Sequence, residues 1–592
     1  MSFEDLADFP KRVASLIGGV LDTKEKASPG EWAIVENVCH LRDIESEGYS
    51  VRIDQLLHED DPLLRDLNGN QLAIERRYIE DDCDAALRAF ANARAQSVSL
   101  LRNADERAFA REGTFENAGR ITLAQLVTKM REHDAGHLHD IALLVALDRF
   151  AQQRDEFRAD LEELCRIPGV SASDPKEVRR SAEATARLLE KHGIGNVRLL
   201  EVDNAHPSVF GSIDVDPQLP TLLIYGHHDV QPVGKIDRWT TPPFEPAERD
   251  GRLYGRGTSD DKGGVLAHVA AAASYRGAPP CNLTFFIEGE EEIGSPNLGQ
   301  FLESYGELLR ADAVVLADTP NADTGIPALT QSLRGLCIVD IEVRTLERPL
   351  HSGRGGGAAP DAIAILCKLI ADVIPSVARD PGGRGAMNVP RGPARPGPSL
   401  TLGMTNEKLH RDLGLLDGVA LTGTREQTWN EPAIAVIGFD APPVEQSFNQ
   451  LAASARARLS IRTVPPRDSA SYGEEIIAKL KAISMPHALV SAQIVKSVPW
   501  WRTDATGPVF DAARRALTRG YGREVEMIGT GGSISFVGTF ESAFAGTPLL
   551  LMGVEDPPCN AHSENESLHL ADWESCVRAS IILYDELRRA LR

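Results

Sequence analysis

Residues 1–146 carry apolar positions three and four apart, the spacing of amphipathic helices. Two predicted helices begin at capping boxes, Ser28–Glu31 and Thr122–Gln125. Two others lie near residues 3–20 and 78–103. No strand pattern interrupts them, so the pattern predicts an N-terminal four-helix bundle.

From residue 147 onward, short apolar runs rich in β-forming residues alternate with helical stretches. Four runs are bounded by glycine, proline or charge: Leu222–Tyr225, Leu283–Ile287, Ala313–Leu316 and Leu549–Met552. Such runs are typical of strands buried on both faces of a parallel sheet. We therefore expect an α/β catalytic domain with a mainly parallel sheet.

A third pattern interrupts this domain. It opens with a strand-like run, Leu336–Val343, and closes with another, Ala457–Arg462. Residues 380–400, rich in proline, glycine and arginine, are expected to form a mobile loop. The expected division is residues 1–146, a discontinuous α/β domain of residues 147–334 and 465–592, and an α+β insert of residues 335–464.

The composition indicates which binding partners and which cellular compartment to expect. The chain has 86 acidic and 63 basic residues and a net charge of −23, which disfavours nucleic acid and anionic membranes as partners. Its eight cysteines show no C-x-x-C spacing, which argues against a disulfide framework and a zinc knuckle. An acidic start and the lack of a long apolar run predict a cytoplasmic protein.

Chemistry-bearing residues follow the predicted strands. They are His227 and Asp229, Asp260 after a glycine-rich loop, Glu290–Glu292, Asp318 and His562. Because the carboxyl ends of parallel strands meet at one edge, these side chains should converge there. Each piece alone is commonplace, but together they predict a divalent-metal site, since a cation would neutralise the crowded carboxylates. Of two adjacent carboxylates, one can ligate metal while the other acts as general base.

Residues 148–592 resemble the di-metal aminoacylase/carnosinase-type metallopeptidase family, most closely its cytosolic non-specific dipeptidase branch. The resemblance rests on Tyr225–Pro232, Gly255–Gly264, Glu290–Ser295, Leu350–Gly353, Gly531–Ile534 and Ala561–Glu566. It implies two divalent metal ions, with zinc favoured over manganese or cobalt. It also implies that the insert is a lid and dimerisation domain, and that a cis peptide follows Asp260.

The resemblance also implies individual roles. Asp260 would bridge the metals, with His227 and Asp318 on one, Glu292 and His562 on the other, Glu291 as general base and Asp229 supporting His227. His351 would reach the partner subunit's site in a homodimer. Substrate would be held by Arg462, Asn449, Gly532 and Ser533. His228, where tyrosine is usual, and the glycine-rich residues 353–358 depart from the family pattern and leave the pocket's shape open.

The expected function is hydrolysis of dipeptides or short peptides by a water activated by two metals. An N-acyl-amino-acid deacylase or carbamoylase would use the same site and is the alternative. A non-catalytic metal-dependent binding protein would require a missing ligand or base, and all are present.

The N-terminal region holds a second candidate site. His133 and His137 lie one helical turn apart, and His40 can supply a third ligand. Through Trp32–Asp43 and His133–His137 the region resembles the DinB-like four-helix metal-binding superfamily. This implies an accessory zinc, nickel or iron site, or a separate thiol-transferase module.

Overall fold

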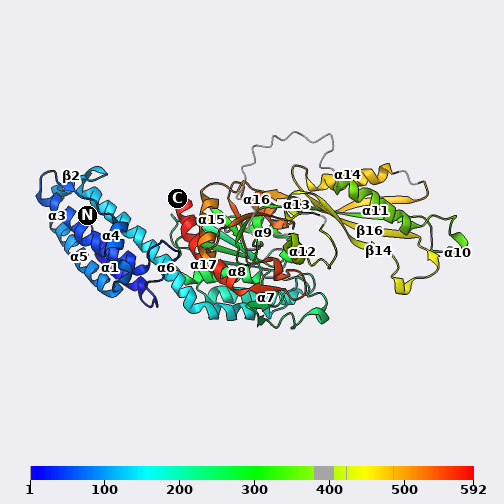
Figure 1. Ribbon diagram of the computed structural model, residues 1–592, viewed down its shortest axis with the longest axis horizontal. Coiled ribbons are helices and arrows are strands. Elements are labelled where there is room, and N and C mark those ends of the chain that lie inside the picture. The colour runs from blue at the N-terminus through cyan, green and yellow to red at the C-terminus, as the bar shows by residue number, and fades with distance from the viewer. Residues whose placement is uncertain (1, 379–405, 422, 484–485, 592) are drawn as a thin grey trace.

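The computed structural model describes residues 2–378, 406–421, 423–483 and 486–591, so the loop expected at 380–400 lies outside the described residues. Three regions follow one another along the long axis (Figure 1). They are an N-terminal helical region, a central α/β domain and a smaller inserted domain.

The central sheet has the strand order β20-β10-β6-β9-β5-β4. Its strands are β20 (Leu549–Leu551), β10 (Ala313–Leu316), β6 (Thr221–His227), β9 (Asn282–Glu288), β5 (Ser208–Ile213) and β4 (Gly195–Leu200). The first four are parallel, and β5 and β4 run antiparallel to their neighbours. All four apolar runs therefore form strands as predicted.

Helices cover both faces of this sheet. The helices on one side are α6 (Leu123–Cys165), α8 (Lys262–Ser274), α15 (Pro508–Tyr521) and α17 (Leu570–Ala590), and those on the other are α9 (Leu298–Tyr305) and α16 (Ser535–Ala543). Alternate residues of β6 enter the two cores, Leu222 and Ile224 on one side and Leu223 and Tyr225 on the other. Burial of both faces explains why the strand is apolar throughout.

The remaining elements of the α/β domain lie around this sheet. α7 (Pro175–Lys191) packs against β4 and β5. Two small sheets complete the domain: β7 (Ala247–Arg249), β8 (Arg252–Tyr254) and β21 (Ser567–His569) form one, and β11 (Ala328–Leu333), β18 (Trp501–Arg502) and β19 (Glu526–Thr530) form the other.

The inserted domain is an antiparallel sheet in the order β14-β16-β12-β17, with helices α11 and α14 packed on it. Its elements are β12 (Gly335–Arg344), α11 (Ala362–Ala378), β14 (Ala433–Asp440), β16 (Ser454–Thr463), α14 (Ser469–Ala482) and β17 (Leu489–Val498). β17 pairs with β12 along its length, so the domain extends to residue 498 and the predicted end at 464 is wrong. Exposed and partly buried residues alternate along β17, so its sequence lacks the continuous apolar run that marks a strand buried on both faces.

In the N-terminal helical region (residues 2–146), α1 and α2 each contact α5 and α6. The helices are α1 (Glu4–Ile17), α2 (Ile34–Asp43), a π-helical turn (Ile44–Tyr49), α3 (Ser50–His58), α4 (Gly69–Glu75), α5 (Cys83–Asn103) and the first half of α6. α2 starts six residues later than Ser28 because the Glu36 carboxylate caps the Ala33 N–H instead.

The prediction that no strand occurs in this region is wrong. β1 (Leu63–Leu64), β2 (Glu112–Phe115) and β3 (Gly119–Thr122) form a small sheet. Strands of two to four residues are too short to show alternation in the sequence.

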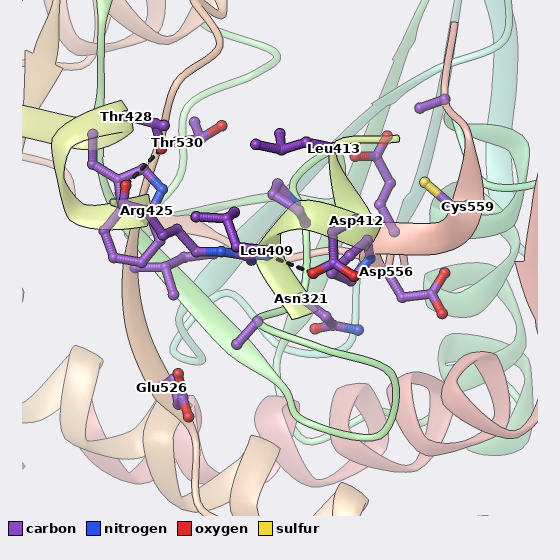
Figure 2. A pocket seen from close by; sticks show the side chains of 18 of the residues that line it. Asn321, Leu409, Asp412, Leu413, Arg425, Thr428, Glu526, Thr530, Asp556 and Cys559 are labelled. Atoms are coloured by element: carbon purple, nitrogen blue, oxygen red, sulfur yellow. Dashed lines mark hydrogen bonds and ion pairs between the residues drawn. The ribbon is translucent and has the colours of Figure 1, made fainter. Parts of the chain in front are cut away.

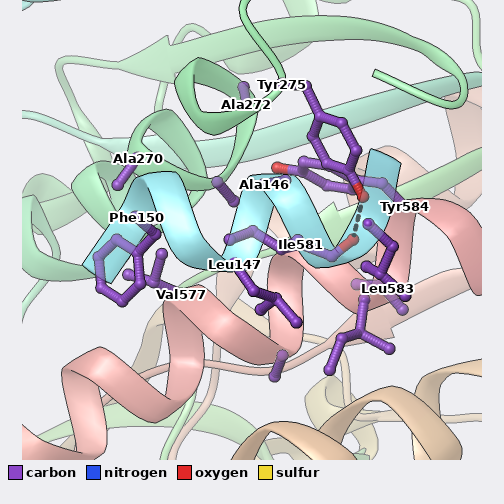
Figure 3. Packing of buried hydrophobic residues seen from close by; sticks show 14 of the residues in the cluster. Ala146, Leu147, Phe150, Ala270, Ala272, Tyr275, Val577, Ile581, Leu583 and Tyr584 are labelled. Carbon is purple, nitrogen blue, oxygen red and sulfur yellow. Dashed lines mark hydrogen bonds between the residues drawn. The ribbon is translucent and has the colours of Figure 1, made fainter. Parts of the chain in front are cut away.

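Helix α6 joins the N-terminal helical region to the α/β domain. It is continuous for 43 residues and passes through 146/147, where the sequence predicted a boundary. Figure 3 shows Ala146, Leu147 and Phe150 of α6 packed with α8 and α17, near Tyr275, whose hydroxyl donates to the Ile581 carbonyl at 2.9 Å. The two regions therefore share one apolar core.

Two further sequence features have structural counterparts. All eight cysteines are free thiols, as their spacing indicated. Among the described residues, every helix is too short or too polar to cross a membrane.

Candidate metal centre

The carboxyl ends of the four parallel strands meet at one edge of the sheet. The side chains that follow them are His227 and Asp229 after β6, Glu291 and Glu292 after β9, Asp318 after β10 and Glu555 after β20. Asp260 joins them from the amino end of α8, and the peptide between Asp260 and Asp261 is cis. His562 comes from the loop before β21.

Asp260 lies between the two histidines. Its Oδ1 is 3.0 Å from His227 Nε2, and its Oδ2 is 2.9 Å from His562 Nε2. His562 Nε2 is also 3.3 Å from a Glu292 carboxylate oxygen, and His227 Nε2 is 3.9 Å from Asp318. One carboxylate thus faces two imidazoles, each of which has a second carboxylate beside it.

The other ring nitrogen of His227, Nδ1, faces Asp229. Nδ1 lies 3.1 Å from the Asp229 main-chain oxygen and 3.4 Å from its carboxylate Oδ1. The sequence predicted the carboxylate as the partner, but the main-chain oxygen is nearer. The Asp229 carboxylate in turn accepts the Glu292 N–H at 3.1 Å, which ties the ends of β6 and β9 together.

Negative charge exceeds positive charge in this buried space. Burial raises the pKa of Glu291 to about 8 and that of Glu292 to about 7, and repulsion by neighbouring carboxylates adds to the rise. Hydrogen bonds to Asp260 and Glu292 raise the pKa of His562 to about 11. Buried carboxylates crowded around imidazoles, with no sulfur ligand, fit divalent cations.

Glu555 is a member of this cluster that sequence reasoning did not single out. Its carboxylate groups with those of Asp260 and Asp318, within 4.8 Å of one another. Burial, followed by repulsion from Asp260, raises its pKa well above the usual range. Its position directly after the β20 run was the available signal. The seven residues His227, Asp260, Glu291, Glu292, Asp318, Glu555 and His562 are called the acidic cluster below.

Figure 2 shows a cavity of about 380 Å³ lined by residues that include Asn321 and Asp556. Glu555 also lines this cavity, which therefore adjoins the acidic cluster. Part of its wall comes from two short helices between α11 and β14, α12 (Asn406–Asp412) and α13 (Arg425–Asn430). Arg425 donates to the Asp412 carboxylate at 2.8 Å and joins the two helices.

Two predicted substrate residues meet where the two domains join. Arg462 donates to the Ser533 hydroxyl at 2.9 Å, and Gly532 directly precedes Ser533 in the chain. A second guanidinium, Arg334, donates to the Gly531 carbonyl at 3.3 Å. Burial and the nearby Arg462 lower the pKa of Arg334 to about 10. Sequence reasoning missed Arg334, although it stands between β11 and β12 where the chain enters the inserted domain.

The structure does not bring His351 and Asn449 to the acidic cluster of the same chain. His351 ends β13 (Leu350–His351), is exposed and is followed by α10 (Ser352–Gly355) at the far end of the inserted domain (Figure 1). Ser352 N–H donates to the Asn449 carbonyl at 2.8 Å, just before β15 (Gln450–Leu451) pairs with β13. The two residues are therefore neighbours.

The N-terminal histidines do converge. His40 Nε2 and His133 Nε2 are 3.0 Å apart, and His137 groups with both. Burial lowers the pKa of His40 to about 3 and that of His133 to about 2, and the neighbouring His137 adds to both shifts. The rings are therefore neutral at pH 7, as metal binding requires. A Cβ at Gly69 would lie 2.3 Å from His40, so only glycine fits behind this ring.

Buried charges brace this histidine cluster (His40, His133 and His137). Arg94 donates to both Asp134 oxygens, at 2.6 and 2.9 Å, and lies 2.9 Å from Glu45. Asp134 is next to His133 on α6, and Glu45 lies in the π-helical turn after α2. The ion pairs thus link α5 to the two segments that carry the histidines.

Comparison with known proteins identifies the α/β part. Residues 223–583, more than half of the chain, match the profile of Peptidase family M20/M25/M40. The chain belongs to this family. The cysteinylglycine-S-conjugate dipeptidase of Corynebacterium striatum is 34% identical over 407 residues, which are 67% of this chain and 87% of that protein. The Cys-Gly metallodipeptidase dug1 of Schizosaccharomyces pombe is 29% identical and aligns with 74% of this chain and 96% of its own length.

A solved structure and a second profile complete the comparison. Human carnosine dipeptidase 1 shares the fold, with a TM-score of 0.64 and 24% identity over 76% of this chain and 99% of that chain. Residues 5–141 match the DinB superfamily. A family M20/M25/M40 peptidase is thus joined to a DinB-like region in one chain.

Glu566 holds the loop that presents Asp260. Its buried carboxylate accepts hydrogen bonds from Arg256, the main-chain N–H groups of residues 257, 259 and 260, and the Ser259 hydroxyl. Glu566→Gln is expected to lower the free energy of unfolding by about 3 kcal/mol, since an amide cannot replace every charged bond. Urea unfolding followed by tryptophan fluorescence measures this loss.

Glu564→Gln is the matched control on the same loop. Glu564 is partly exposed at the surface and accepts the Lys235 main-chain N–H at 3.1 Å. Its loss of stability should be far smaller than that of Glu566→Gln, because surface substitutions usually change stability little. Equal losses in the two variants would contradict the role given to Glu566.

Proposed function

We propose that the chain is a dipeptidase that uses two divalent cations held by the acidic cluster. The observation that carries the proposal is Asp260, whose two carboxylate oxygens face His227 and His562 separately at about 3 Å. Such a carboxylate suits a ligand shared by two cations. The relatives named above as dipeptidases support the substrate class.

The remaining ligands follow from the same geometry. His227 and Asp318 would complete one cation site, and Glu292 and His562 the other. Nitrogen and oxygen donors without sulfur favour zinc, with manganese or cobalt as alternatives. Glu555 lies beside Asp260 and Asp318 and would add to the negative charge around the first cation.

Catalysis would have two parts: electrostatic activation by the cations and proton transfer by Glu291. Bound cations supply the positive charge that makes water acidic and polarises the scissile carbonyl. Glu291, beside His227 and Asp318 but not needed as a ligand, takes a proton from the attacking water on its carboxylate. It then gives this proton to the leaving amine, which is a general-base and general-acid role in one residue.

Substrate length would be limited by the guanidiniums at the domain junction. Arg462, with Ser533 and Gly532 beside it, can hold the terminal carboxylate of a dipeptide, and Arg334 adds a second positive charge. The 380 Å³ cavity next to Glu555 is within the size range of small-molecule sites and would take a substrate side chain.

We also propose a homodimer formed through the inserted domain. His351 is exposed and far from the acidic cluster of its own chain, so a partner subunit's cluster is where it can act, with Asn449 beside it. The domains of this proposal are residues 1–146, the α/β part before 335 and after 498, and the inserted domain between them.

The histidine cluster of the N-terminal region would hold a separate metal ion, zinc, nickel or iron. Three neutral imidazoles within reach of one point support this assignment. The region would then be an accessory metal-binding domain of the peptidase.

Glu291 and Glu292 are adjacent but have different proposed roles, which makes them a matched pair. Glu291→Gln should keep the wild-type metal content and lower dipeptide turnover about 10²–10⁴-fold, since only the proton carrier is lost. Glu292→Gln should lose about one metal equivalent. Elemental analysis and amino-acid release from dipeptides measure both. Metal loss in Glu291→Gln with full retention in Glu292→Gln would reverse the roles.

The dimer assignment can be tested by mixing two inactive variants. His351→Ala and Glu291→Gln, each inactive alone, should recover about a quarter of wild-type activity when co-expressed, because half of the dimers then hold one complete site. Steady-state hydrolysis measures the recovery. Activity no higher than the sum of the single variants would show that His351 acts within its own chain or not at all.

His133→Ala should remove about one metal equivalent from the full-length chain, because two histidines hold a cation much more weakly than three. His139→Ala, on the same helix outside the histidine cluster, is the control and should keep the wild-type content. Elemental analysis after dialysis measures the metal content of both variants. Equal metal content in both variants would refute the N-terminal site.

A further inference from the structure

A second cavity, of about 400 Å³, lies where the N-terminal helical region meets the α/β domain. Its walls come from both regions. The loop before α2 and the middle of α6 form one side, while Arg519 of α15 and Glu586 and Arg589 of α17 form the other. In Figure 1 the carboxyl-terminal end of α17 lies beside α6, where these walls meet.

One end of this junction cavity borders the histidine cluster at His137. His137 lines the cavity, and its Nδ1 is 2.8 Å from the Asn37 side-chain oxygen. Trp32, also in the wall, stacks on His137 with an interplanar angle of 13° and packs against His40 at 4.8 Å. A molecule in the cavity would therefore contact the edge of the cluster.

The other end is charged and joins the two regions. Arg519 donates to Glu586 at 3.0 Å and to Glu31 at 2.8 Å, and Arg589 donates to Asp140 at 2.9 Å. The Arg519 side chain lines the cavity and is 18% exposed, so a ligand carboxylate there can reach part of its guanidinium group.

The charged side chains that line the junction cavity favour one chemical class of ligand. Two guanidiniums and three carboxylates line the junction cavity, so a phosphate or another polyanion would meet net repulsion. A molecule with one carboxylate and one ammonium group could pair with both signs at once. Leu143, Leu144 and Trp32 leave an apolar wall for its side chain.

We propose that the junction cavity binds a free α-amino acid. Its carboxylate would accept from Arg519, its ammonium group would donate to Asp140, and its side chain would lie along Trp32 toward the histidine cluster. The α/β domain would thus contribute Arg519 to this site, and the N-terminal helical region would contribute Asp140 and Trp32. The idea that peptide hydrolysis delivers this amino acid rests on the proposed function, whereas the binding itself does not.

Isothermal titration calorimetry of the full-length protein with L-leucine tests the proposal. Arg462→Met, which impairs the peptidase carboxylate site, should keep this binding. Asp140→Asn and Arg519→Met should each weaken it about tenfold or more, because each removes a charged hydrogen-bond partner. Arg523→Met, an exposed arginine just after α15 and outside the cavity, is the charge-matched control and should bind normally.

Three further comparisons make the result specific. L-leucinol, without the carboxylate, and 4-methylpentanoate, without the ammonium group, should each bind at least about tenfold more weakly than leucine. Asn70→Trp, at the exposed start of α4, should fill the cavity without touching the Arg519 pairs and should abolish binding.

The proposal is overturned if leucine does not bind, or if Arg462→Met abolishes binding while Asp140→Asn, Arg519→Met and Asn70→Trp leave it intact. Failure of dipeptide hydrolysis with intact leucine binding would refute only the proposed function.

Discussion

The crowding of carboxylates at the ends of four parallel strands is the constraint on which the rest of the structure depends. Asp260, Glu291, Glu292, Asp318 and Glu555 crowd around the buried His227 and the more exposed His562, and burial opposes ionisation of the carboxylates. Such a cluster persists only if the surrounding fold fixes it firmly. The sheet buried on both faces and the Glu566 carboxylate under the Asp260 loop supply that rigidity.

A second constraint is the continuity of α6. Because the helix carries His133 and His137 in its first half and ends in the core of the α/β domain, the two regions are fixed relative to one another. This rigidity creates the junction cavity, whose Arg519 and Arg589 come from one region and whose Glu31 and Asp140 come from the other. The fused architecture therefore builds a surface that neither region has alone.

Much of this could be predicted from local sequence. Strands such as β6 and β9 are buried on both faces, so each appears in the sequence as a short apolar run. The His or Glu after one run is commonplace, and the site was predictable because several runs end in this way. Other features depended on tertiary partners. β17 alternates, and it joins the inserted domain by pairing with β12 and packing on α14. The roles of Glu555 and Arg334 depend on neighbours that are distant in sequence. The start of α2 was misplaced because Glu36, not Ser28, provides the cap.

The central claim is that the acidic cluster holds two cations bridged by Asp260. Anomalous X-ray diffraction from crystals of the zinc-loaded protein, recorded at the zinc edge, tests it most directly. The account predicts two peaks flanking the Asp260 carboxylate, one beside His227 and Asp318 and the other beside Glu292 and His562. A single peak there, or zinc bound elsewhere with the cluster empty, would contradict it.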